Sequence, residues 1–416
     1  MNREVAVIGL GYIGLPTAVV LANSGWQVTG VDVSDRTIEY VREGKLPFVE
    51  DGLEEALASA VEQGSLTAQK ETPEAEIYIV SVPSPLKDDK SLEPKFIDAA
   101  TDAIIPKLRG GELLILESTV PPGTTERMAE RVFSERPELK TGDNPVLFAH
   151  APERVLPGRI MIEMRTNDRI VGGITPEATA RAAELYKSFC TGEVILTDAR
   201  TAEMSKLAEN AYRDVNIAYA NELSVICDEL GIDVWELIGL ANRHPRVNIL
   251  NPGPGVGGHC IAVDPWFIIA ATDQAKLIGQ AREVNDSKPH WVLSKIDAAV
   301  KAAGKAPTIA LLGLAFKPNI DDLRESPALQ IASAVASQYE DNRIMLVEPN
   351  ITEPPAEFAE HANVEFAHAK SAIEAADIVV LLVAHDEFVA LDLIASDEKL
   401  VIDTTGTWRD PVEAIV

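Results

Sequence analysis

One cysteine of the chain lies in a setting that favours covalent chemistry. Cys260 follows a glycine-rich run, 253–258, and stands four residues before Asp264. Glycines let backbone N–H groups approach a reacting group, and a thiol is nucleophilic only where its surroundings favour the thiolate. The pattern predicts a nucleophile site, and the alternative is a buried cysteine beside a flexible turn.

A second motif predicts a dinucleotide site. Gly9, Gly11 and Gly14 follow an apolar run at 5–8, and a second apolar run ends at Asp32. In such a unit the first glycine allows a tight turn, the second admits a pyrophosphate and the third brings helix against strand. An acid at position 32 can bind both ribose hydroxyls and would repel a 2′-phosphate, so NAD is favoured over NADP.

Three further side chains are candidates for the cofactor site. Arg36 could neutralise a 2′-phosphate, or could be a solvated helix residue. Ser84 and Thr119 lie on loops 81–85 and 117–123, which follow apolar runs. Ligands of open α/β sheets bind at the carboxyl ends of strands, so we expect these hydroxyls near nicotinamide ribose or substrate. The alternative is two ordinary turns.

An amine, an amide and a guanidinium share one face of a long predicted helix. Lys206, Asn210 and Arg213 stand at i, i+4 and i+7 in the segment 201–230, which has no proline or glycine. Lysine with asparagine can stabilise a developing oxyanion, whereas a polar stripe can also be merely solvated. Cationic side chains on loops 152–159, 242–248 and 316–324 are either diphosphate ligands or structural ion pairs.

The alternation of apolar and amphipathic segments predicts the fold. Strands are expected at 5–8, 27–31, 77–82, 113–116, 146–148, 308–312, 344–347, 378–383 and 400–403, and helices of the middle third at 201–230, 234–241 and 265–298. We expect an α/β protein with two Rossmann-like domains joined by a mainly helical central domain with a long helix. The expected boundaries are 1–197 for the NAD-binding domain, 198–300 for the helical domain with the cysteine loop, and 301–416 for the C-terminal domain.

The two ends of the chain share a short pattern. A strand followed by Gly-Leu occurs at Gly9 and at Gly313, and a neighbouring strand ends in an acid at Asp32 and at Glu348. This pattern suggests two related nucleotide-binding folds.

The composition restricts the class of protein. The net charge of −28 argues against a nucleic-acid partner, which requires a positive field. The cysteines at 190, 227 and 260 are odd in number and widely spaced, a poor disulfide framework. Neither a signal peptide nor an apolar run long enough to cross a membrane is evident. We therefore expect a cytoplasmic protein with no membrane partner.

Together these segments resemble the UDP-glucose/GDP-mannose dehydrogenase family over nearly the whole chain. The resemblance is carried by 9–16, 117–119, 152–154, 206–213, 257–264 and 313–327. Segments 241–250 and 259–267 look like those of enzymes that oxidise UDP-N-acetyl-D-mannosamine. Enzymes for UDP-N-acetylglucosamine are the nearest alternative, usually with proline at the position of Ala262, and UDP-glucose enzymes typically carry serine where this chain has His259.

The resemblance implies a four-electron oxidation of a sugar C6 hydroxymethyl group to a carboxylate, with two NAD and no metal. Lys206 and Asn210 would stabilise the reacting oxygen, and Asp264 would assist a bound water. Cys260 would form a thiohemiacetal and then a thioester, which water oriented by Glu153 would hydrolyse. Thr119 would also belong to the catalytic site.

The same resemblance implies ligand contacts and an assembly. NAD would contact Gly9, Gly11, Tyr12, Ile13, Gly14, Asp32, Arg36, Ser84 and Thr119. The UDP-sugar would contact Arg154, Val155, Lys206, Asn210, Arg213, His244, Arg246, Gly257, Phe316, Lys317, Arg324 and Arg409. A homodimer would form through the middle helices, with the loop of His244 and Arg246 reaching the partner's site.

Two rival functions use the same residues. A cysteine hydrolase would pair Cys260 with His259, but adjacent side chains on an extended backbone point apart. A non-catalytic regulator would bind NAD without oxidising a substrate.

Overall fold

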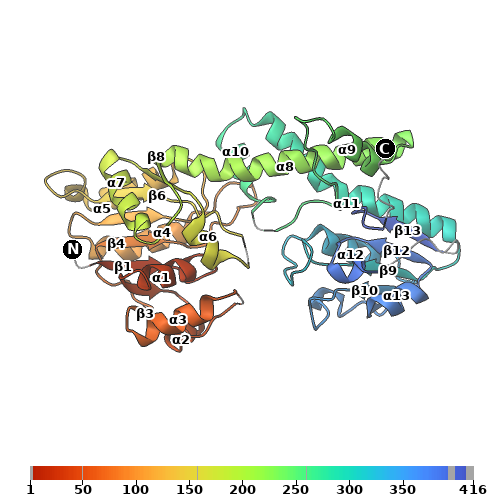
Figure 1. Ribbon diagram of the computed structural model, residues 1–416, viewed down its shortest axis with the longest axis horizontal. Helices are drawn as coiled ribbons and strands as arrows, with labels where there is room; N and C mark the ends of the chain where they lie inside the picture. Colours follow the sequence, from red (N-terminus) through yellow and green to blue (C-terminus); the bar gives the residue numbers. More distant parts are fainter. Residues whose placement is uncertain (1–2, 49, 157, 259, 392–398, 409–416) are drawn as a thin grey trace. The chain divides into compact units, whose positions relative to one another are not determined.

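The computed structural model describes residues 3–48, 50–156, 158–258, 260–391 and 399–408. The chain divides into two compact units (Figure 1). Unit 1 consists of Met1–Glu209 with Trp266–Ala271, and unit 2 of Asn210–Pro265 with Thr272–Val416.

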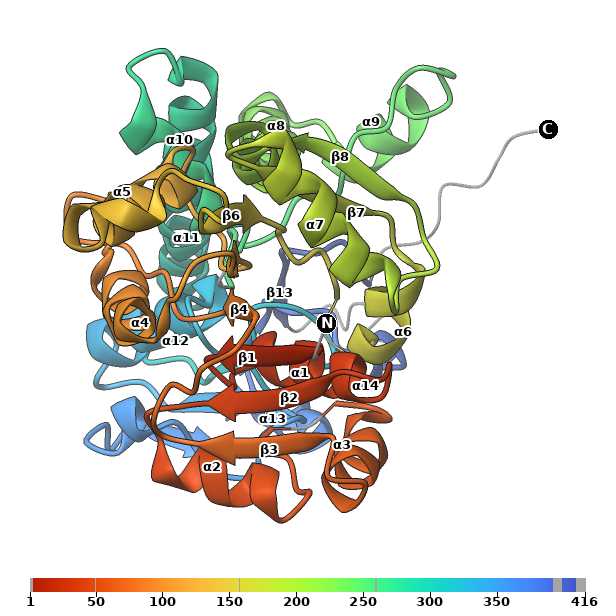
Figure 2. The same cartoon turned by 90° about the vertical axis from the view of Figure 1, so that its left-hand side faces the viewer.

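Unit 1 is built on one eight-stranded sheet in the order β3-β2-β1-β4-β5-β6-β7-β8. Its neighbouring strands are parallel except β6 and β7. The strands are β1 (Glu4–Ile8), β2 (Gln27–Val31), β3 (Leu66–Gln69), β4 (Ile77–Val80), β5 (Leu113–Leu116), β6 (Leu147–His150), β7 (Arg169–Gly173) and β8 (Val194–Asp198). Figure 2 shows β1, β2 and β3 side by side.

Helices cover both faces of this sheet. They are α1 (Gly14–Ala22), α2 (Asp35–Arg42), α3 (Leu53–Glu62), α4 (Lys95–Ile104), α5 (Thr124–Glu135), α6 (Ile160–Thr166) and α7 (Pro176–Lys187), with 3-10 turns η1 (Ile105–Lys107) and η2 (Pro137–Leu139). Val5 and Val7 pack into one hydrophobic cluster, and Ala6 and Ile8 pack into another. Successive strand residues point to opposite faces, so both faces of β1 are buried, as in parallel sheets covered by crossover helices.

Unit 2 carries a five-stranded parallel sheet in the order β11-β10-β9-β12-β13. Its strands are β9 (Ile309–Leu312), β10 (Ile344–Val347), β11 (Val364–Phe366), β12 (Ile378–Leu381) and β13 (Leu400–Asp403). Its helices besides the long ones are α9 (Val234–Ala241), α12 (Pro327–Gln338), α13 (Ala369–Ala375) and α14 (Asp386–Val389), with the 3-10 turn η3 (Ala356–Phe358). The first five strands of unit 1 have the same order, so the two sheets share the 3-2-1-4-5 arrangement of nucleotide-binding folds.

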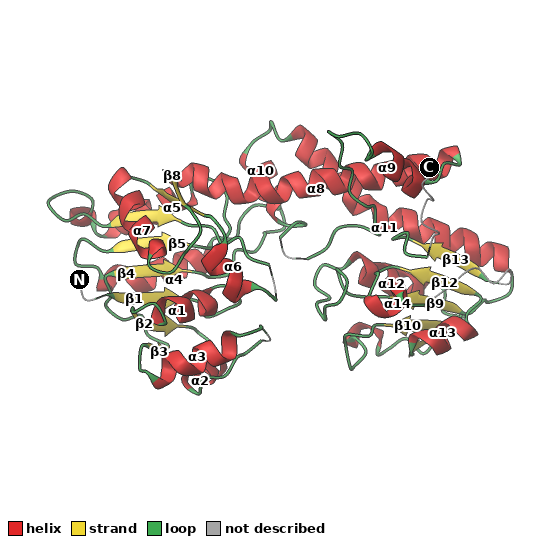
Figure 3. Ribbon diagram, viewed as in Figure 1, coloured by secondary structure: helices red, strands yellow, loops and turns green. Residues whose placement is uncertain are grey.

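Long helices make up the middle of the chain (Figure 3). The longest is α8 (Ala199–Leu230), with 32 residues, and it stops before Gly231, whose φ is +67°. The expected stretch 265–298 is two helices, α10 (Asp264–Ala271) and α11 (Lys276–Ala303). The break occurs at Thr272, whose backbone is extended and whose hydroxyl accepts the N–H of Gln274 at 3.2 Å. The hydroxyl of Thr272 thus accepts a backbone N–H in place of a helical carbonyl, and the helix is interrupted at this residue.

The α/β fold with a long central helix is therefore confirmed. Each of the nine expected strands is present, with ends that differ by one or two residues at five of them. The strands β3, β7, β8 and β11 were not predicted. Ile195 and Leu196 of the edge strand β8 are both exposed. The strand therefore lacks the alternation of apolar and polar residues by which a half-buried strand is predicted from sequence. No helix of the described residues is long and apolar enough to cross a membrane.

Candidate active site

The glycine turn after β1 has room for a ligand where the motif requires it. Gly9 has a φ of +95°, and a side chain there would collide with the carbonyl oxygen of Ser81. A side chain at Gly14 would collide with the carbonyl of Gly9, so helix α1 packs directly against the turn. A Cβ at Gly11 would meet no atom within 4 Å. The middle glycine is thus the open one, as close approach of a pyrophosphate demands.

The acid of the motif lies at the end of β2 and is only half-buried. Asp32 accepts hydrogen bonds from Leu10 N at 2.9 Å and Ser34 N at 2.8 Å, so its carboxylate is fixed beside the glycine turn. Arg36 is exposed, and its guanidinium lies 5.4 Å from the centre of the Tyr40 ring. The arrangement fits the two hydroxyls of an unphosphorylated ribose.

The remaining predicted cofactor residues line the same edge of the sheet. Tyr12 donates its hydroxyl to Glu50 at 2.8 Å, and Ile13 is the N-cap residue of α1. Ser84 and Thr119 follow β4 and β5, and both are half-buried. The two loops are joined because Ser118 Oγ donates to the carbonyl of residue 82 at 2.6 Å and accepts its N–H at 3.0 Å. The carboxyl ends of β1, β2, β4 and β5 therefore form one candidate NAD site.

Glu153, just beyond β6, is held by a buried arginine. Arg169 Nη2 lies 2.6 Å from Glu153 Oε2, and Arg154 N donates to Glu153 Oε1 at 2.7 Å. Arg154 itself pairs with Glu209 of α8 at 2.8 Å, and Val155 packs against the hydrophobic core of unit 1. The carboxylate of Glu153 is thus oriented by the protein before any ligand binds.

A second buried acid lies behind this pair. Glu117 accepts hydrogen bonds from Tyr186 at 2.8 Å and Thr17 at 3.1 Å, and Arg169 Nη1 lies 4.0 Å away. Burial raises the pKa of Glu117 to about 7, against the opposing effect of Arg169. Sequence reasoning missed the roles of Arg169, Tyr186 and Thr17, although an arginine inside the apolar strand 169–173 is a signal that could have revealed the first.

The helix α8 carries the three polar residues that the sequence grouped. Lys206 is half-buried, Asn210 is buried and Arg213 is exposed. Asn210 Nδ2 donates to Asp264 Oδ2 at 2.5 Å, and Asp264 is 3% exposed at the start of α10. Cys260 is exposed, and its carbonyl accepts the N–H of Asp264 at 2.8 Å. The alternative of a buried cysteine at this position is therefore wrong.

A buried polar network supports the glycine-rich loop before Cys260. Asn221 of α8 accepts the N–H of Gly253 at 2.9 Å and donates to Asn285 of α11 at 2.9 Å. Asn285 donates to Asp214, which also pairs with Arg282 at 2.6 Å. The loop is thus tied to both long helices.

The same loop packs on the residues that follow β9. A side chain at Gly257 would collide with the carbonyl of Glu325, and one at Gly258 with the ring of Phe316. Gly258 N donates to the carbonyl of Arg324 at 3.3 Å. Unit 2 therefore brings together three of the predicted substrate residues, Gly257, Phe316 and Arg324.

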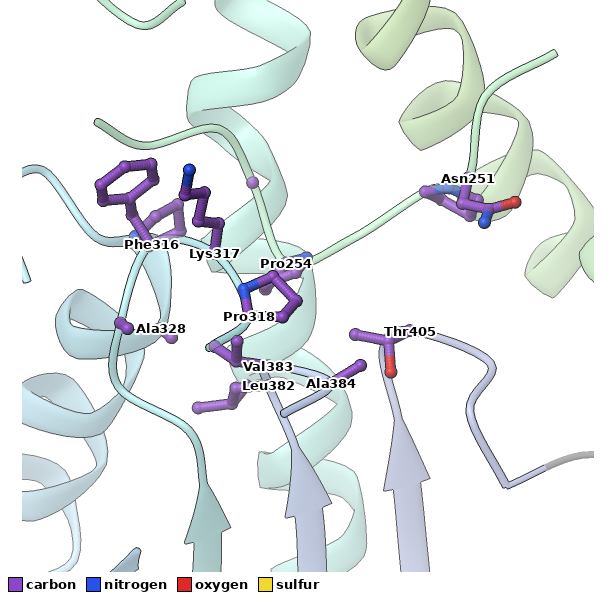
Figure 4. A pocket seen from close by; sticks show the side chains of 14 residues that line it. Asn251, Pro254, Phe316, Lys317, Pro318, Ala328, Leu382, Val383, Ala384 and Thr405 are labelled. Carbon is purple, nitrogen blue, oxygen red and sulfur yellow. The ribbon is translucent and has the colours of Figure 1, made fainter. Parts of the chain in front are cut away.

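A cavity of about 310 Å³ lies over the carboxyl ends of the strands of unit 2. Figure 4 shows Phe316 and Lys317 on the loop above the strand ends, and Thr405 across the cavity. The lining residues come from five segments: 251–252 with 254–255, 315–318, 327–328, 382–384, and Thr405. Among the described residues of this lining, Lys317 carries a positive charge, so an anionic ligand fits here.

Other predicted substrate residues are not joined to this group. His244 and Arg246 are exposed on the turn after α9, where Arg246 N donates to His244 Nδ1 at 3.3 Å. Arg324 belongs to the group through its backbone carbonyl, whereas its side chain is exposed and pairs with Asp322 of the same loop. Arg409 and His259 lie outside the described residues.

Three family models match consecutive parts of the chain. They describe the NAD binding domain (residues 3–190), the central domain (residues 200–287) and the UDP binding domain (residues 310–410) of the UDP-glucose/GDP-mannose dehydrogenase family. The chain belongs to this family. It is an oxidoreductase that uses NAD, and unit 2 contains its UDP-binding region.

Relatives match over almost their full length. A UDP-N-acetyl-D-mannosamine dehydrogenase of Salmonella typhi is 51% identical, with 97% of this chain and 99% of the relative covered. An NDP-N-acetyl-D-galactosaminuronic acid dehydrogenase of Ralstonia nicotianae is 50% identical, with 98% and 96% covered. Among solved structures, a UDP-D-MAnNAc dehydrogenase of Pyrococcus horikoshii has a TM-score of 0.86 at 35% identity, with 99% and 98% covered. The UDP-N-acetyl-mannosamine dehydrogenase of Staphylococcus aureus has a TM-score of 0.83 at 38% identity, with 99% and 96% covered.

Proposed function

We propose that this chain oxidises UDP-N-acetyl-D-mannosamine at C6 to UDP-N-acetyl-D-mannosaminuronate in two NAD-dependent steps. The observation that carries the proposal is the exposed Cys260 beside the buried Asp264, whose carboxylate is held by Asn210. Two relatives named UDP-N-acetyl-D-mannosamine dehydrogenase, 51% and 50% identical in sequence to this chain, support the choice of sugar.

The cofactor residues are proposed as an NAD site. The open space at Gly11 admits the pyrophosphate, and Asp32 accepts the ribose hydroxyls. Gly9, Tyr12, Ile13, Gly14, Arg36, Ser84 and Thr119 complete the proposed contacts. NAD supplies the hydride acceptor for both oxidations.

In the first oxidation, the chain must stabilise an alcohol oxygen that loses its proton. Lys206 and the amide of Asn210 stabilise that oxygen, and Asp264 accepts a hydrogen bond from the water that takes up the proton. The hydrogen bond between Asn210 and Asp264 sets the orientation of both side chains.

In the second oxidation, an aldehyde has no hydride to give until a nucleophile adds to its carbon. The Cys260 thiolate adds to the aldehyde carbon, so that a C–S bond forms as the C=O π bond opens to an alkoxide. Loss of hydride from this thiohemiacetal anion restores the C=O bond and leaves a thioester. Glu153 then accepts a hydrogen bond from water that attacks the thioester, which releases the carboxylate and the free thiol. Arg169 holds Glu153 in place for this role.

We propose that the UDP-sugar contacts residues of the cavity loops and of α8. The proposed residues are Arg154, Val155, Lys206, Asn210, Arg213, His244, Arg246, Gly257, Phe316, Lys317, Arg324 and Arg409. Lys317 and Phe316 beside the cavity support a nucleoside diphosphate there, because the ammonium binds phosphate and the ring can contact an apolar face of the ligand.

We also propose a cytoplasmic homodimer with domains at 1–197, 198–300 and 301–416. The support for a dimer is an apolar stripe on α8, in which Tyr212, Tyr219 and Ile226 are exposed at seven-residue spacing. A partner subunit on this stripe would also explain why His244 and Arg246 lie exposed and separate from the cavity residues of their own chain.

The test is a substrate panel in which NADH is followed by its absorbance. UDP-N-acetylmannosamine, UDP-N-acetylglucosamine and UDP-glucose are compared, with UDP-N-acetylgalactosamine added because of the Ralstonia relative. We expect UDP-N-acetylmannosamine to give the highest kcat/KM and two NADH per sugar. A higher kcat/KM for another sugar would replace the proposed substrate, and no NADH with any of them would favour a hydrolase or a non-catalytic NAD-binding protein.

A further inference from the structure

The turn after β9 repeats the hydrogen bonds of the turn after β1. Gly9 and Gly313 have positive φ values of +95° and +91°. In each turn the next residue donates its N–H to the acid that follows the neighbouring strand. That acid is Asp32 in unit 1, at 2.9 Å, and Glu348 in unit 2, at 2.8 Å. The expected relation between the two ends of the chain thus extends to individual hydrogen bonds.

The two acids differ in what covers them. Asp32 is half-buried, whereas Glu348 is 4% exposed, because the ring of His385 lies against it with Nε2 3.0 Å from Glu348 Oε2. Burial opposes ionisation of Glu348, but hydrogen bonds from His385 and from backbone N–H groups prevail and lower its pKa to about 2. The hydrogen bonds of the Glu348 carboxylate are therefore made inside the protein, and a ribose cannot reach it.

The hydrogen bonds around His385 fix its tautomer. Asn319 N donates to His385 Nδ1 at 2.9 Å, and the amide of Asn350 lies 2.9 Å from the same atom. A nitrogen that accepts an N–H carries no proton, so the proton of the neutral ring is on Nε2 and is donated to Glu348. The ring is 1% exposed, so water does not compete for these bonds.

His385 links the two loops that line the cavity. Residues 315–318 form one part of its wall, and Asn319 follows them with a positive φ of +62°. Residues 382–384 form another part, and His385 follows them directly. Asn319 is further tied to this second loop because its side-chain oxygen accepts Asp386 N at 3.0 Å. The position of Lys317 over the strand ends therefore depends on a contact just outside the cavity.

We propose that His385, oriented by Glu348, is a positioning residue for nucleotide binding that holds the turn 316–319 in place for a nucleoside diphosphate. The inference rests on the proposed function, since it takes the cavity beside Lys317 as the site of the UDP moiety. His385 does not touch the ligand in this proposal and acts through the backbone N–H of Asn319.

Two substitutions separate the two sides of the ring. In His385→Asn the side-chain oxygen takes the place of Nδ1 and can still accept the N–H of Asn319. In His385→Gln the terminal amide takes the place of Nε2 and can still donate to Glu348, but the acceptor for Asn319 is lost. His368→Gln is the control, because His368 is an exposed residue of the same unit.

The full-length variants are tested for UDP binding by calorimetry and for steady-state kinetics. We expect His385→Gln to raise the Kd for UDP and the KM for the UDP-sugar about 10-fold, as for loss of one buried hydrogen bond. The kcat at saturation and the Kd for NAD should stay within about twofold, and His385→Asn should bind UDP within about threefold of wild type. His368→Gln should match wild type.

Several outcomes would overturn the proposal. The first is an equal affinity for UDP in wild type and in His385→Gln. The second is an equal loss of UDP affinity in His385→Asn and His385→Gln. The third is a fall in the kcat of His385→Gln with its KM for the UDP-sugar unchanged. If the wild-type chain itself fails to bind UDP, the proposed function fails instead. The tautomer is tested on the wild-type protein by ¹⁵N NMR of labelled histidines, with His385 assigned by its absence from either variant, and a proton on Nδ1 would contradict the proposal.

Discussion

Arg169 Nη2 lies 2.6 Å from Glu153 Oε2, and both side chains are buried in the interior of unit 1. The same guanidinium lies 4.7 Å from the Tyr186 ring centre and 4.0 Å from Glu117. One cation therefore stands between two buried acids, and the orientation of Glu153 depends on it.

Removal of this cation should destabilise unit 1. We expect Arg169→Met to lower the free energy of unfolding by about 3–5 kcal/mol, because two carboxyl groups remain buried without their cation. Urea denaturation measures the change. Adding Glu117→Gln should recover part of the loss, whereas Arg165→Met, at an exposed position, should have little effect. A loss below about 1 kcal/mol for Arg169→Met would contradict the assigned role.

The half-buried Asp32 should contribute to NAD affinity. We expect Asp32→Asn to raise the Kd for NAD by about 10- to 100-fold, since hydrogen bonds to a charged acceptor are lost. Fluorescence titration measures this. Asp35→Asn is the matched control, because Asp35 is exposed and pairs with Lys70 at the surface. An unchanged Kd in Asp32→Asn would show that the ribose contact is misassigned.

The exposed Cys260 should be required for the second oxidation. We expect Cys260→Ser to lose acid formation by at least about 100-fold while its Kd for NAD stays near that of wild type. Product analysis by chromatography distinguishes aldehyde from acid. Cys190→Ser is the control, because Cys190 is half-buried beside the core of unit 1. Full turnover to acid in Cys260→Ser would exclude the thioester.

The buried Lys288 on α11 should make stability depend on pH. Its ammonium nitrogen lies 3.6 Å from the Trp291 ring centre, and burial lowers its pKa from 10.5 to about 7. The unfolded chain binds more protons between these two values, so stability from this group rises with pH over that range. We expect wild type to gain about 2 kcal/mol over Lys288→Met between pH 7 and pH 9.

Urea midpoints at the two pH values measure this gain. The exposed Lys305→Met should show no such change relative to wild type. A difference between wild type and Lys288→Met that is the same at both pH values would refute the assignment.

The apolar stripe on α8 should hold the proposed dimer together. Tyr219 is 52% exposed between Tyr212 and Ile226, so a charge there would be buried on association. We expect Tyr219→Glu to raise the dimer dissociation constant by at least about 100-fold, as for a buried unpaired charge. Analytical ultracentrifugation measures it, with Phe96→Glu in unit 1 as the control. A dimer of unchanged affinity would place the interface elsewhere.

The sequence by itself determined the features that depend on neighbouring residues. The glycine turn, Asp32 and the strands of apolar residues are local patterns, because turn geometry and side-chain alternation are set within a few residues. The long helix and its stop at Gly231 follow for the same reason.

Tertiary structure alone decided which distant residues meet. Tyr186 and Glu117 are 69 residues apart in sequence, and His385 and Glu348 are 37 apart, so no spacing rule could pair them. The pattern at the two ends of the chain suggested equivalent acids at 32 and 348. Only the tertiary structure shows that the ring of His385 covers Glu348, because burial depends on which strands and loops become neighbours.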